Sequence, residues 1–412
     1  MSANLISENG EEHRRVLARA EKYRDKITGF LRDLIRIPGT SCLEGDVILR
    51  IREEMKSCGF DEIIIDGMGN IIGRIGSGKT LIAIDAHIDT AGIGSPEEWK
   101  WDPYEGKLEN GVVFGRGASD QLAGMAGAVY SGAVIRDEGL EGDYTLYVTG
   151  TVQEEDCDGL CWQYIIKEDK IRPECVVITE PTGLNVYRGH RGRMEIGVRV
   201  RGVSCHGSAP ERGRNPVYAM ASLVKEIKGL NRNLKDDNFL GKGSVAVSYI
   251  DCKTPSLCAV PSECYIHLDR RLTRGETRES ALREVEAAAE RAGINPGEIE
   301  VQIPRYDLPS YTGLVYPSEK YYPVWDIPET HRLCRAALET TGELFGDVPA
   351  VGKWCFSTNG VATMGIFGVP TVGFGPGNEI YAHTVEDQVP VEHLVKATAW
   401  YALFPGIYCR SK

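Results

Sequence analysis

The chain has 412 residues, more than one hydrophobic core usually organises, so we expect two domains. Hydrophobic residues make up 42% and charged residues 26%, which is typical of a globular protein and excludes a disordered chain, a coiled coil or a collagen-like fibre. The 47 basic and 59 acidic residues give a formal net charge of −12, a poor surface for DNA phosphates or anionic lipid. We therefore expect neither a nucleic-acid partner nor a membrane partner.

The start of the chain and its cysteines both favour a cytoplasmic protein. The first 26 residues are polar and mixed in charge, unlike a signal peptide, and no stretch approaches the roughly 20 apolar residues of a membrane span. Twelve cysteines without a CxxC pair are not a dense disulfide framework. Reduced thiols in the cytoplasm are the prediction.

The first 185 residues alternate between helical and strand patterns. Helices are expected at 14–37, at 44–58 and after Asp120, and strands at 63–65, 70–75, 80–86, 143–151 and 176–179. Because the strands are almost entirely apolar, the pattern predicts an α/β sheet with both faces buried.

From residue 186 the pattern changes. Strands are expected at 195–201, 243–250, 262–270 and 298–303, with helices at 215–229 and 276–292. This βαββαβ order is the ferredoxin-like unit. A helix and strand pattern resumes at 328–345, 370–375 and 391–405, after a long loop at 304–327. We therefore predict a domain at 186–303 inserted into a discontinuous domain formed by 1–185 and 304–412.

One motif suggests nucleotide binding. Residues 73–80, GRIGSGKT, match the phosphate-binding pattern GxxxxGK[ST]. Such a loop needs a helix after it, because the free N–H groups of that helix bind the phosphates. Here Lys79 and Thr80 lead into the apolar run LIAIDA, which reads as a strand, so a hairpin turn is favoured. A P-loop nucleotide hydrolase stays open as an alternative function.

Residues with metal-binding chemistry follow the predicted strands. His87 ends the strand 80–86, where α/β sheets place their ligands. Asp89 lies two residues on, and a carboxylate there can accept the second ring N–H of a metal-bound histidine. Asp120 lies between a glycine-rich turn and a small-residue helix. It could cap that helix or offer two oxygens to two cations.

Further candidates follow other strands. Glu154 and Glu155 come after the strand 143–151, and adjacent carboxylates raise the pKa of one of them unless a cation neutralises the pair. Glu180 follows the strand 176–179, and His383 follows 370–375. Each position alone is more often structural, but their coincidence in one α/β domain favours paired divalent cations. Two histidines with carboxylates and no cysteine suit Zn²⁺ or a similar ion.

These motifs, in this order, resemble a known family. The chain is similar to the dinuclear zinc amidohydrolases and peptidases that include aminoacylases, acetylornithine deacetylase, succinyl-diaminopimelate desuccinylase and glutamate carboxypeptidases. The segments that carry the likeness are Ile37–Ser41, Gly69–Ile71, His87–Asp89, Trp101–Tyr104, Gly115–Asp120, Glu154–Glu155, Glu180–Thr182, Gly202–Pro210, Asp269–Arg271 and Ala382–His383. More narrowly, Phe356–Gly360 and Gly373–Gly377 resemble a branch described as selenium-metabolism-linked hydrolases.

The resemblance implies a fold and a mechanism. The fold would be a zinc-exopeptidase-like α/β/α catalytic domain with an inserted ferredoxin-like lid, which would also form a homodimer. Two divalent metal ions, Zn most often and Co or Mn otherwise, would be held by His87, Asp120, Glu155, Glu180 and His383. Asp120 would bridge both metals, with His87 and Glu180 completing one site and Glu155 and His383 the other.

The resemblance also implies the catalytic and substrate residues. Glu154 would be the general base for a metal-bridging water that attacks an amide carbonyl, with Asp89 and the lid residue His206 assisting. Arg271 would bind a substrate carboxylate, with Arg270 as the fallback if the strand alternation is misread, and Asn359 would also contact the substrate.

Three segments near the substrate pocket depart from the family. Asp120 is followed by Gln121-Leu122-Ala123 instead of x-Lys-Gly, a lid asparagine is replaced in Cys258–Pro261, and residues 357–360 read STNG. Amide hydrolysis of an N-acyl amino acid, a dipeptide or a related carboxylate-bearing compound is therefore the expected reaction, without one named substrate. A non-catalytic metal-dependent binding protein on the same fold is a further alternative.

Overall fold

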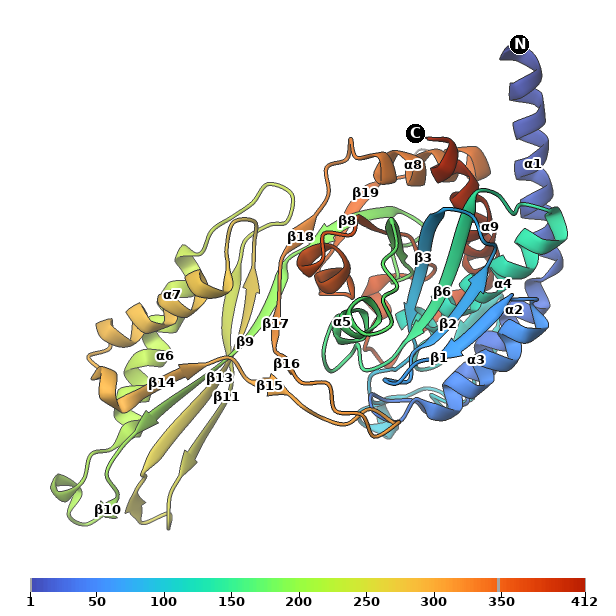
Figure 1. The fold of residues 1–412 in the computed structure, drawn as a ribbon. Coiled ribbons are helices and arrows are strands. Elements are labelled where there is room, and N and C mark those ends of the chain that lie inside the picture. Colours follow the sequence, from blue (N-terminus) through green and yellow to red (C-terminus); the bar gives the residue numbers. More distant parts are fainter. Residues whose placement is uncertain (1, 347–348, 412) are drawn as a thin grey trace.

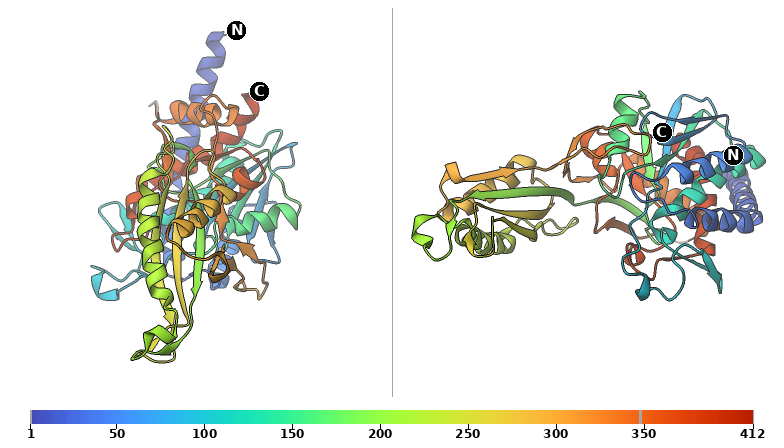
Figure 2. Two further views of the ribbon diagram at one scale, coloured as in Figure 1. Left: turned by 90° about the vertical axis from the view of Figure 1, so that its left-hand side faces the viewer. Right: turned by 90° about the horizontal axis from the view of Figure 1, so that it is seen from below.

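The computed structural model describes residues 2–346 and 349–411 and shows two lobes (Figure 1). One lobe contains a large mixed sheet and the other a smaller sheet, and a second view shows the lobes end to end with a narrow connection (Figure 2). Each lobe has its own cluster of buried apolar side chains. Following the domains expected from the sequence, we call the smaller lobe the lid and the larger one the catalytic lobe.

The large sheet forms the centre of the catalytic lobe. Its strands, in spatial order, are β1 (Glu62–Ile65), β2 (Ile71–Ile75), β6 (Tyr144–Thr151), β3 (Thr80–His87), β7 (Cys175–Ile178), β20 (Thr371–Gly373), β8 (Val186–His190) and β18 (Trp325–Asp326), and β19 (Val351–Trp354) pairs with β8. The four neighbours β6, β3, β7 and β20 run parallel. Their carboxyl ends therefore lie along one edge of the sheet, where open α/β sheets place ligands.

Helices pack on this sheet and on one another. They are α1 (Ser2–Lys22), α2 (Arg24–Ile35), α3 (Gly45–Ser57), α4 (Ala123–Glu138), α5 (Leu160–Lys167), α8 (Arg332–Phe345) and α9 (Val391–Arg410), with short helical segments η1 (Pro96–Glu98), η2 (Ala118–Leu122), η5 (Val361–Ile366) and η6 (Glu379–Tyr381). Helix α4 is rich in small residues because it packs closely. A Cβ added to Gly124 would lie 2.2 Å from Thr179 Oγ1. This packing fixes the turn before α4, which carries Asp120.

The lid has the predicted βαββαβ order. Its elements are β9 (Gly192–Arg201), α6 (Pro216–Asn233), β11 (Ser244–Lys253), β13 (Glu263–Leu272), α7 (Arg278–Arg291) and β14 (Ile299–Gln302), with β10 (Cys205–His206), β12 (Ala259–Val260), η3 (Pro210–Arg212) and η4 (Pro296–Glu298) in its connections. The antiparallel sheet order β11-β13-β9-β14 is that of a ferredoxin-like unit. The strand β11 forms an edge of this sheet.

Two strands connect the lobes. β8 leads into the lid and β18 leads out of it, and these strands pair through Trp325↔His190 and Asp326↔Gly189. The long loop expected at 304–327 contains the short strands β15 (Arg305–Tyr306), β16 (Ser318–Glu319) and β17 (Tyr321–Tyr322). Although β8 begins at residue 186, it belongs to the large sheet because it pairs with β19, β20 and β18.

Some local expectations need revision. The helix expected over 14–37 is interrupted at Tyr23, between α1 and α2. The segment Gly76–Lys79 leads into strand β3, as predicted, and no helix follows it. It is not a hairpin turn, however, because β6 lies between β2 and β3 in the sheet. Three further strands, β4 (Lys107–Glu109), β5 (Val112–Phe114) and β21 (Gln388–Pro390), form a small separate sheet.

No helix in the described ranges is both long enough and apolar enough to cross a membrane.

Candidate metal centre

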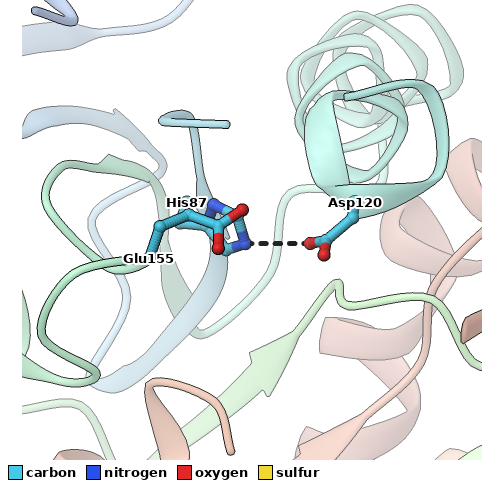
Figure 3. Close-up of side chains that lie close together, drawn as sticks. All are labelled: His87, Asp120 and Glu155. Atoms are coloured by element: carbon cyan, nitrogen blue, oxygen red, sulfur yellow. Dashed lines mark hydrogen bonds and ion pairs between the residues drawn. The ribbon is translucent and has the colours of Figure 1, made fainter. Parts of the chain in front are cut away.

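Three of the parallel strands bring acidic residues and a histidine together. His87 ends β3, Glu154 follows β6 and Glu180 follows β7. The His87 Nε2 atom lies 3.1 Å from Asp120 Oδ1, 3.3 Å from Glu180 Oε1 and 3.9 Å from Glu154 Oε2. Figure 3 shows Asp120 facing the His87 ring from the turn before α4, with Glu155 beside that ring. The predicted strand-end residues thus form one cluster.

The second histidine approaches from the C-terminal part of the chain. His383 Nε2 lies 2.9 Å from Glu155 Oε2 and 3.3 Å from Asp120 Oδ2. Asp120 therefore faces His87 with one carboxylate oxygen and His383 with the other. This is the arrangement that a carboxylate bridging two cations requires. The His383 side chain is 57% exposed, whereas that of His87 is 2% exposed, so the cluster opens to solvent beside His383.

The electrostatics of the cluster favour bound cations. Burial raises the pKa of Glu180 to about 8 and raises the pKa of Glu155. Burial alone would lower the pKa of His87, but the charges of Glu154 and Glu180 raise it well above its ordinary value. Hydrogen bonds to Asp120 and Glu155 raise the pKa of His383 to about 10. The acids therefore stabilise positive charge at this position.

The donor set also fits divalent ions. The groups His87-Asp120-Glu155 and His87-Glu154-Glu180 each place their ligand atoms within 4.8 Å of one another. The Oε1 atom of Glu154 and the Oε2 atom of Glu180 are buried without hydrogen-bond partners. A buried carboxylate oxygen is costly unless a cation or donor reaches it. Imidazole and carboxylate ligands together suit Zn²⁺ and similar ions.

Asp89 connects the histidine to the loop that carries the two glutamates. The His87 Nδ1 atom lies 2.9 Å from the Asp89 main-chain oxygen and 3.6 Å from its carboxylate, so the main-chain oxygen accepts the closer bond. The Asp89 carboxylate accepts hydrogen bonds from the main-chain N–H groups of Glu154 and Glu155 and from the Ser41 hydroxyl. Asp89 thus orients the ring through its main chain and the loop through its side chain.

Glu154 is one of the buried acids of the cluster. Its side chain is buried, and burial raises its pKa well above the ordinary value, with further raising by the charges of Asp158 and Glu180. A carboxyl group with a raised pKa can accept and release a proton near neutral pH.

A cavity of about 330 Å³ lies over the cluster. The residues that line it are His87, Asp120, Glu154, Glu155, Asp158, Glu180, Arg193, Arg271, Cys355, Phe356, Ser357, Glu379, Ala382 and His383. Arg193 and Arg271 come from the lid, where they face each other across β9 and β13. The cavity is therefore enclosed by both lobes.

Seven of the lining residues are not among the site residues predicted from the sequence: Asp158, Arg193, Cys355, Phe356, Ser357, Glu379 and Ala382. Asp158 is buried, accepts a hydrogen bond from the Ser357 hydroxyl, and lies 3.3 Å from the Arg193 guanidinium. In the sequence, Asp158 lies four residues after Glu154, and Glu379 lies four residues before His383. These spacings are the only sequence signals for the two acids.

The lid arginines have different surroundings. Arg271 lines the cavity and forms a bidentate pair with Asp269, with distances of 2.7 and 2.9 Å. Arg270 points to the other face of the sheet, where it is buried and bonds to Glu276 and Glu284. Strand alternation therefore leaves Arg271 as the cavity residue, and the fallback Arg270 does not reach it.

Two predicted site residues lie elsewhere. His206 is exposed on β10, which Figure 1 shows at the end of the lid away from the catalytic lobe. Asn359 is buried below the cavity, where its amide bonds to Asp85, Thr151, Gly159 and Cys161. Asn359 is not among the residues that line the cavity, and its amide takes part in a buried hydrogen-bond network.

A comparison with known sequences identifies the family. A profile of peptidase family M20/M25/M40 matches residues 83–405. The chain belongs to this family. It is 52% identical over 390 residues to YgeY of Escherichia coli K12, which is described as uncharacterized, with 95% of this chain and 96% of that protein covered. It is 27% identical over 278 residues to succinyl-diaminopimelate desuccinylase of Cereibacter sphaeroides, covering 64% and 72%. Membership of the M20 family makes the protein a metallohydrolase of peptide or amide bonds.

Solved structures share the fold. Aminopeptidase PepT of Bacillus cereus aligns with a TM-score of 0.72 at 17% identity, covering 94% of this chain and 99% of PepT. Human carnosine dipeptidase 1 aligns with a TM-score of 0.69 at 15% identity, covering 96% and 99%. YxeP of Bacillus subtilis, described as a dinuclear metal-binding peptidase, aligns with a TM-score of 0.70 at 14% identity, covering 95% and 100%. These matches confirm the predicted fold class.

Proposed function

We propose that this M20 protein hydrolyses the amide bond of an N-acyl amino acid, a dipeptide or a related substrate with a free carboxylate. The position of Glu154 carries the proposal, because a buried carboxylate with a raised pKa lies beside two groups of metal ligands in a cavity. The names of the desuccinylase and dipeptidase relatives support the same reaction class.

The proposed metal ligands follow from the contacts. His87, Asp120 and Glu180 would hold one divalent ion, and Asp120, Glu155 and His383 the other. Zn²⁺ is the proposed ion, with Co²⁺ or Mn²⁺ as substitutes. When bound, such ions lower the pKa of water and polarise a carbonyl group.

Glu154 would move the proton. Its carboxylate would take a proton from the attacking water and deliver it to the leaving amine, which leaves the carboxylate ready for another cycle. Asp89 holds the Glu154 N–H with its side chain and thereby positions this base. Arg271 would bind the substrate carboxylate, because a planar guanidinium forms two parallel bonds to a carboxylate.

His206 can assist only from another subunit or after a large lid movement, because it lies at the distal end of the lid (Figure 1). A homodimer through the lid would provide the first route. The edge strand β11 supports this proposal, since its exposed Tyr249 and Ile250 and its free edge could pair with a second copy.

The expected location is the cytoplasm, and no disulfide joins the cysteines that the structure describes.

The proposal can be tested with metal-loaded protein and a panel of N-acyl amino acids, dipeptides and carbamoyl compounds. We expect up to two divalent ions per chain by elemental analysis and turnover of at least one amide. Glu154→Gln should keep the ions and lose about a hundred- to ten-thousandfold in turnover. Full activity of Glu154→Gln would exclude the mechanism, and bound ions without turnover of any compound would indicate a non-catalytic binding protein.

A further inference from the structure

Glu379 has no role in the mechanism above, although it lines the same cavity. It lies in η6, four residues before the proposed ligand His383. Its Oε2 atom is buried without a hydrogen-bond partner, and none of the described residues forms an ion pair with it. An unpaired buried carboxylate oxygen costs free energy, and a bound water, ion or ligand group can supply the missing partner.

Among the residues that the structure describes, no basic side chain lowers the pKa of Glu379. Burial raises the pKa of its carboxyl group, and only the N–H and thiol of Cys355 act in the opposite direction. Burial raises the pKa of the Tyr187 hydroxyl, and the nearby charge of Glu379 raises it further. Cys355 and Tyr187 are neutral neighbours. A positively charged group of a ligand in the cavity could therefore form the ion pair that Glu379 lacks.

Asp158 provides an internal comparison. It is the other cavity acid outside the proposed ligand set and base, and it is buried more deeply than Glu379. Asp158 has its own partners, because Arg193 lies 3.3 Å away and the Ser357 hydroxyl donates to it. One non-ligand acid is thus paired within the protein, and the other is left unpaired.

The charge balance of the cavity leads to the same result. Six carboxylates and two arginines line it. Both arginines already pair with acids of the lid, Arg271 with Asp269 and Arg193 with Glu195. Two divalent ions would offset four of the six carboxylate charges, so the cavity would stay acidic. A positive charge on the substrate lowers this excess, whereas a second carboxylate adds to it, which disfavours a dicarboxylate such as an N-succinyl amino acid.

We propose that Glu379 binds a positively charged amino group of the substrate, so that the preferred substrates are zwitterions with a carboxylate, an amide and an ammonium group. This inference rests on the proposed amide hydrolysis. The cavity of about 330 Å³ is at the small end of ligand pockets, which suits a compound of dipeptide size. Glu379 is a specificity residue, because it would distinguish substrates without taking part in bond cleavage.

Binding to the metal-loaded Glu154→Gln protein tests this inference without turnover. Isothermal titration would compare alanyl-alanine with N-acetyl-alanyl-alanine, and N-acetylornithine with N-acetylnorvaline, so that the ammonium group lies on either side of the amide. We expect a ten- to hundredfold preference for the cationic member of at least one pair. When Glu379→Gln is added to Glu154→Gln, the ratio of the two affinities should fall close to one. When Glu379→Lys is added instead, the protein should bind N-succinyl-alanine more tightly than alanyl-alanine.

Two controls separate the possible outcomes. Glu290→Gln, an exposed acid on α7, should keep the wild-type preference, and circular dichroism and metal content should show that the Glu379 variants fold. An unchanged preference in Glu379→Gln, or no preference for a cationic ligand in the parent protein, overturns the inference. Turnover of amides by the otherwise wild-type enzyme tests the proposed function separately. If the enzyme cleaves amides while the Glu379 variants keep their preference, only the inference on Glu379 fails.

Discussion

The cavity has two walls of different origin. The metal-facing wall consists of His87, Glu154, Glu155 and Glu180 at the ends of parallel strands, together with Asp120 before α4. The opposite wall combines Arg193 and Arg271 of the lid with Asp158, Ser357 and Glu379 from connecting segments. The first wall is fixed by the register of one sheet, whereas the second depends on how two lobes meet. We infer that the first sets the reaction and the second the substrate.

The largest expected effect lies in the metal-facing wall. Asp120→Asn removes the charge that both histidines face. We expect loss of at least one ion and a fall in activity of more than about a thousandfold, because bound cations contribute several kcal/mol to transition-state stabilisation. Elemental analysis and kcat/KM would measure this effect, with the exposed Asp46→Asn as the control. If Asp120→Asn kept two ions and normal activity, Asp120 would not be a ligand of the metal centre.

A smaller loss of activity is expected from a change at Asp89, which lies behind the metal-facing wall. Asp89→Asn weakens the acceptor for the Glu154 and Glu155 N–H groups but keeps the main-chain oxygen that meets His87. We expect a ten- to hundredfold fall in kcat with the ions retained. A loss of metal binding equal to that of Asp120→Asn would mean that Asp89 acts on the ligands themselves.

The opposite wall should respond mainly in substrate binding. Arg271→Lys keeps the positive charge but loses the planar bidentate donor, so we expect KM to rise about tenfold with a smaller change in kcat. Arg270→Lys, at the neighbouring position, is the matched control variant. It should lower the unfolding midpoint of the protein, because Arg270 bonds to Glu276 and Glu284 inside the lid, and leave KM close to wild type. Equal KM effects in both variants would contradict the assignment.

The smallest effect on activity is expected where the lid begins. His190 accepts bonds from Trp325, Thr358 and the Thr358 N–H, and burial lowers its pKa to about 3. The unfolded histidine binds a proton below about pH 6.5 and the folded one does not, so this group's stabilisation is complete above pH 6.5 and is lost as the pH falls toward 3.

His190→Gln should therefore reduce the pH slope of the unfolding free energy by up to about 1.4 kcal/mol per pH unit below pH 6.5. Urea unfolding of the metal-free wild type and variant between pH 4.5 and 7 would measure the difference. Parallel slopes in the two proteins would show that His190 titrates normally in the folded state.

The metal-facing wall could be predicted from the sequence because its residues follow directly after apolar strands. Parallel strands end at one edge, so His87, Glu154 and Glu180 had to be neighbours once the sheet was identified. The βαββαβ order of the lid was predictable for a similar reason, since each element has a strong local period. Arg271 was expected from the family resemblance, and the alternation of β13 separates it from Arg270.

The opposite wall could not be predicted in this way. Asp158 and Glu379 come from distant segments of the larger lobe and Arg193 comes from the lid, so the tertiary folding of one lobe and the packing of the other bring them to one cavity. Asn359 shows the converse problem, because a polar residue in a loop near the site bonds to the buried Asp85 and does not line the cavity. For His206, the sequence matched a motif, but its placement relative to the catalytic lobe depends on the assembly.

The pairing of β8 with β18 has a consequence for the order of folding during synthesis. The two strands flank the whole lid, so they can pair only after the chain between them has been made and brought back. A lid that is already folded shortens this loop and lowers the entropy cost of closing it. His383 and α9 are synthesised later still. The lid can therefore fold on the ribosome well before the metal centre has its full set of ligands.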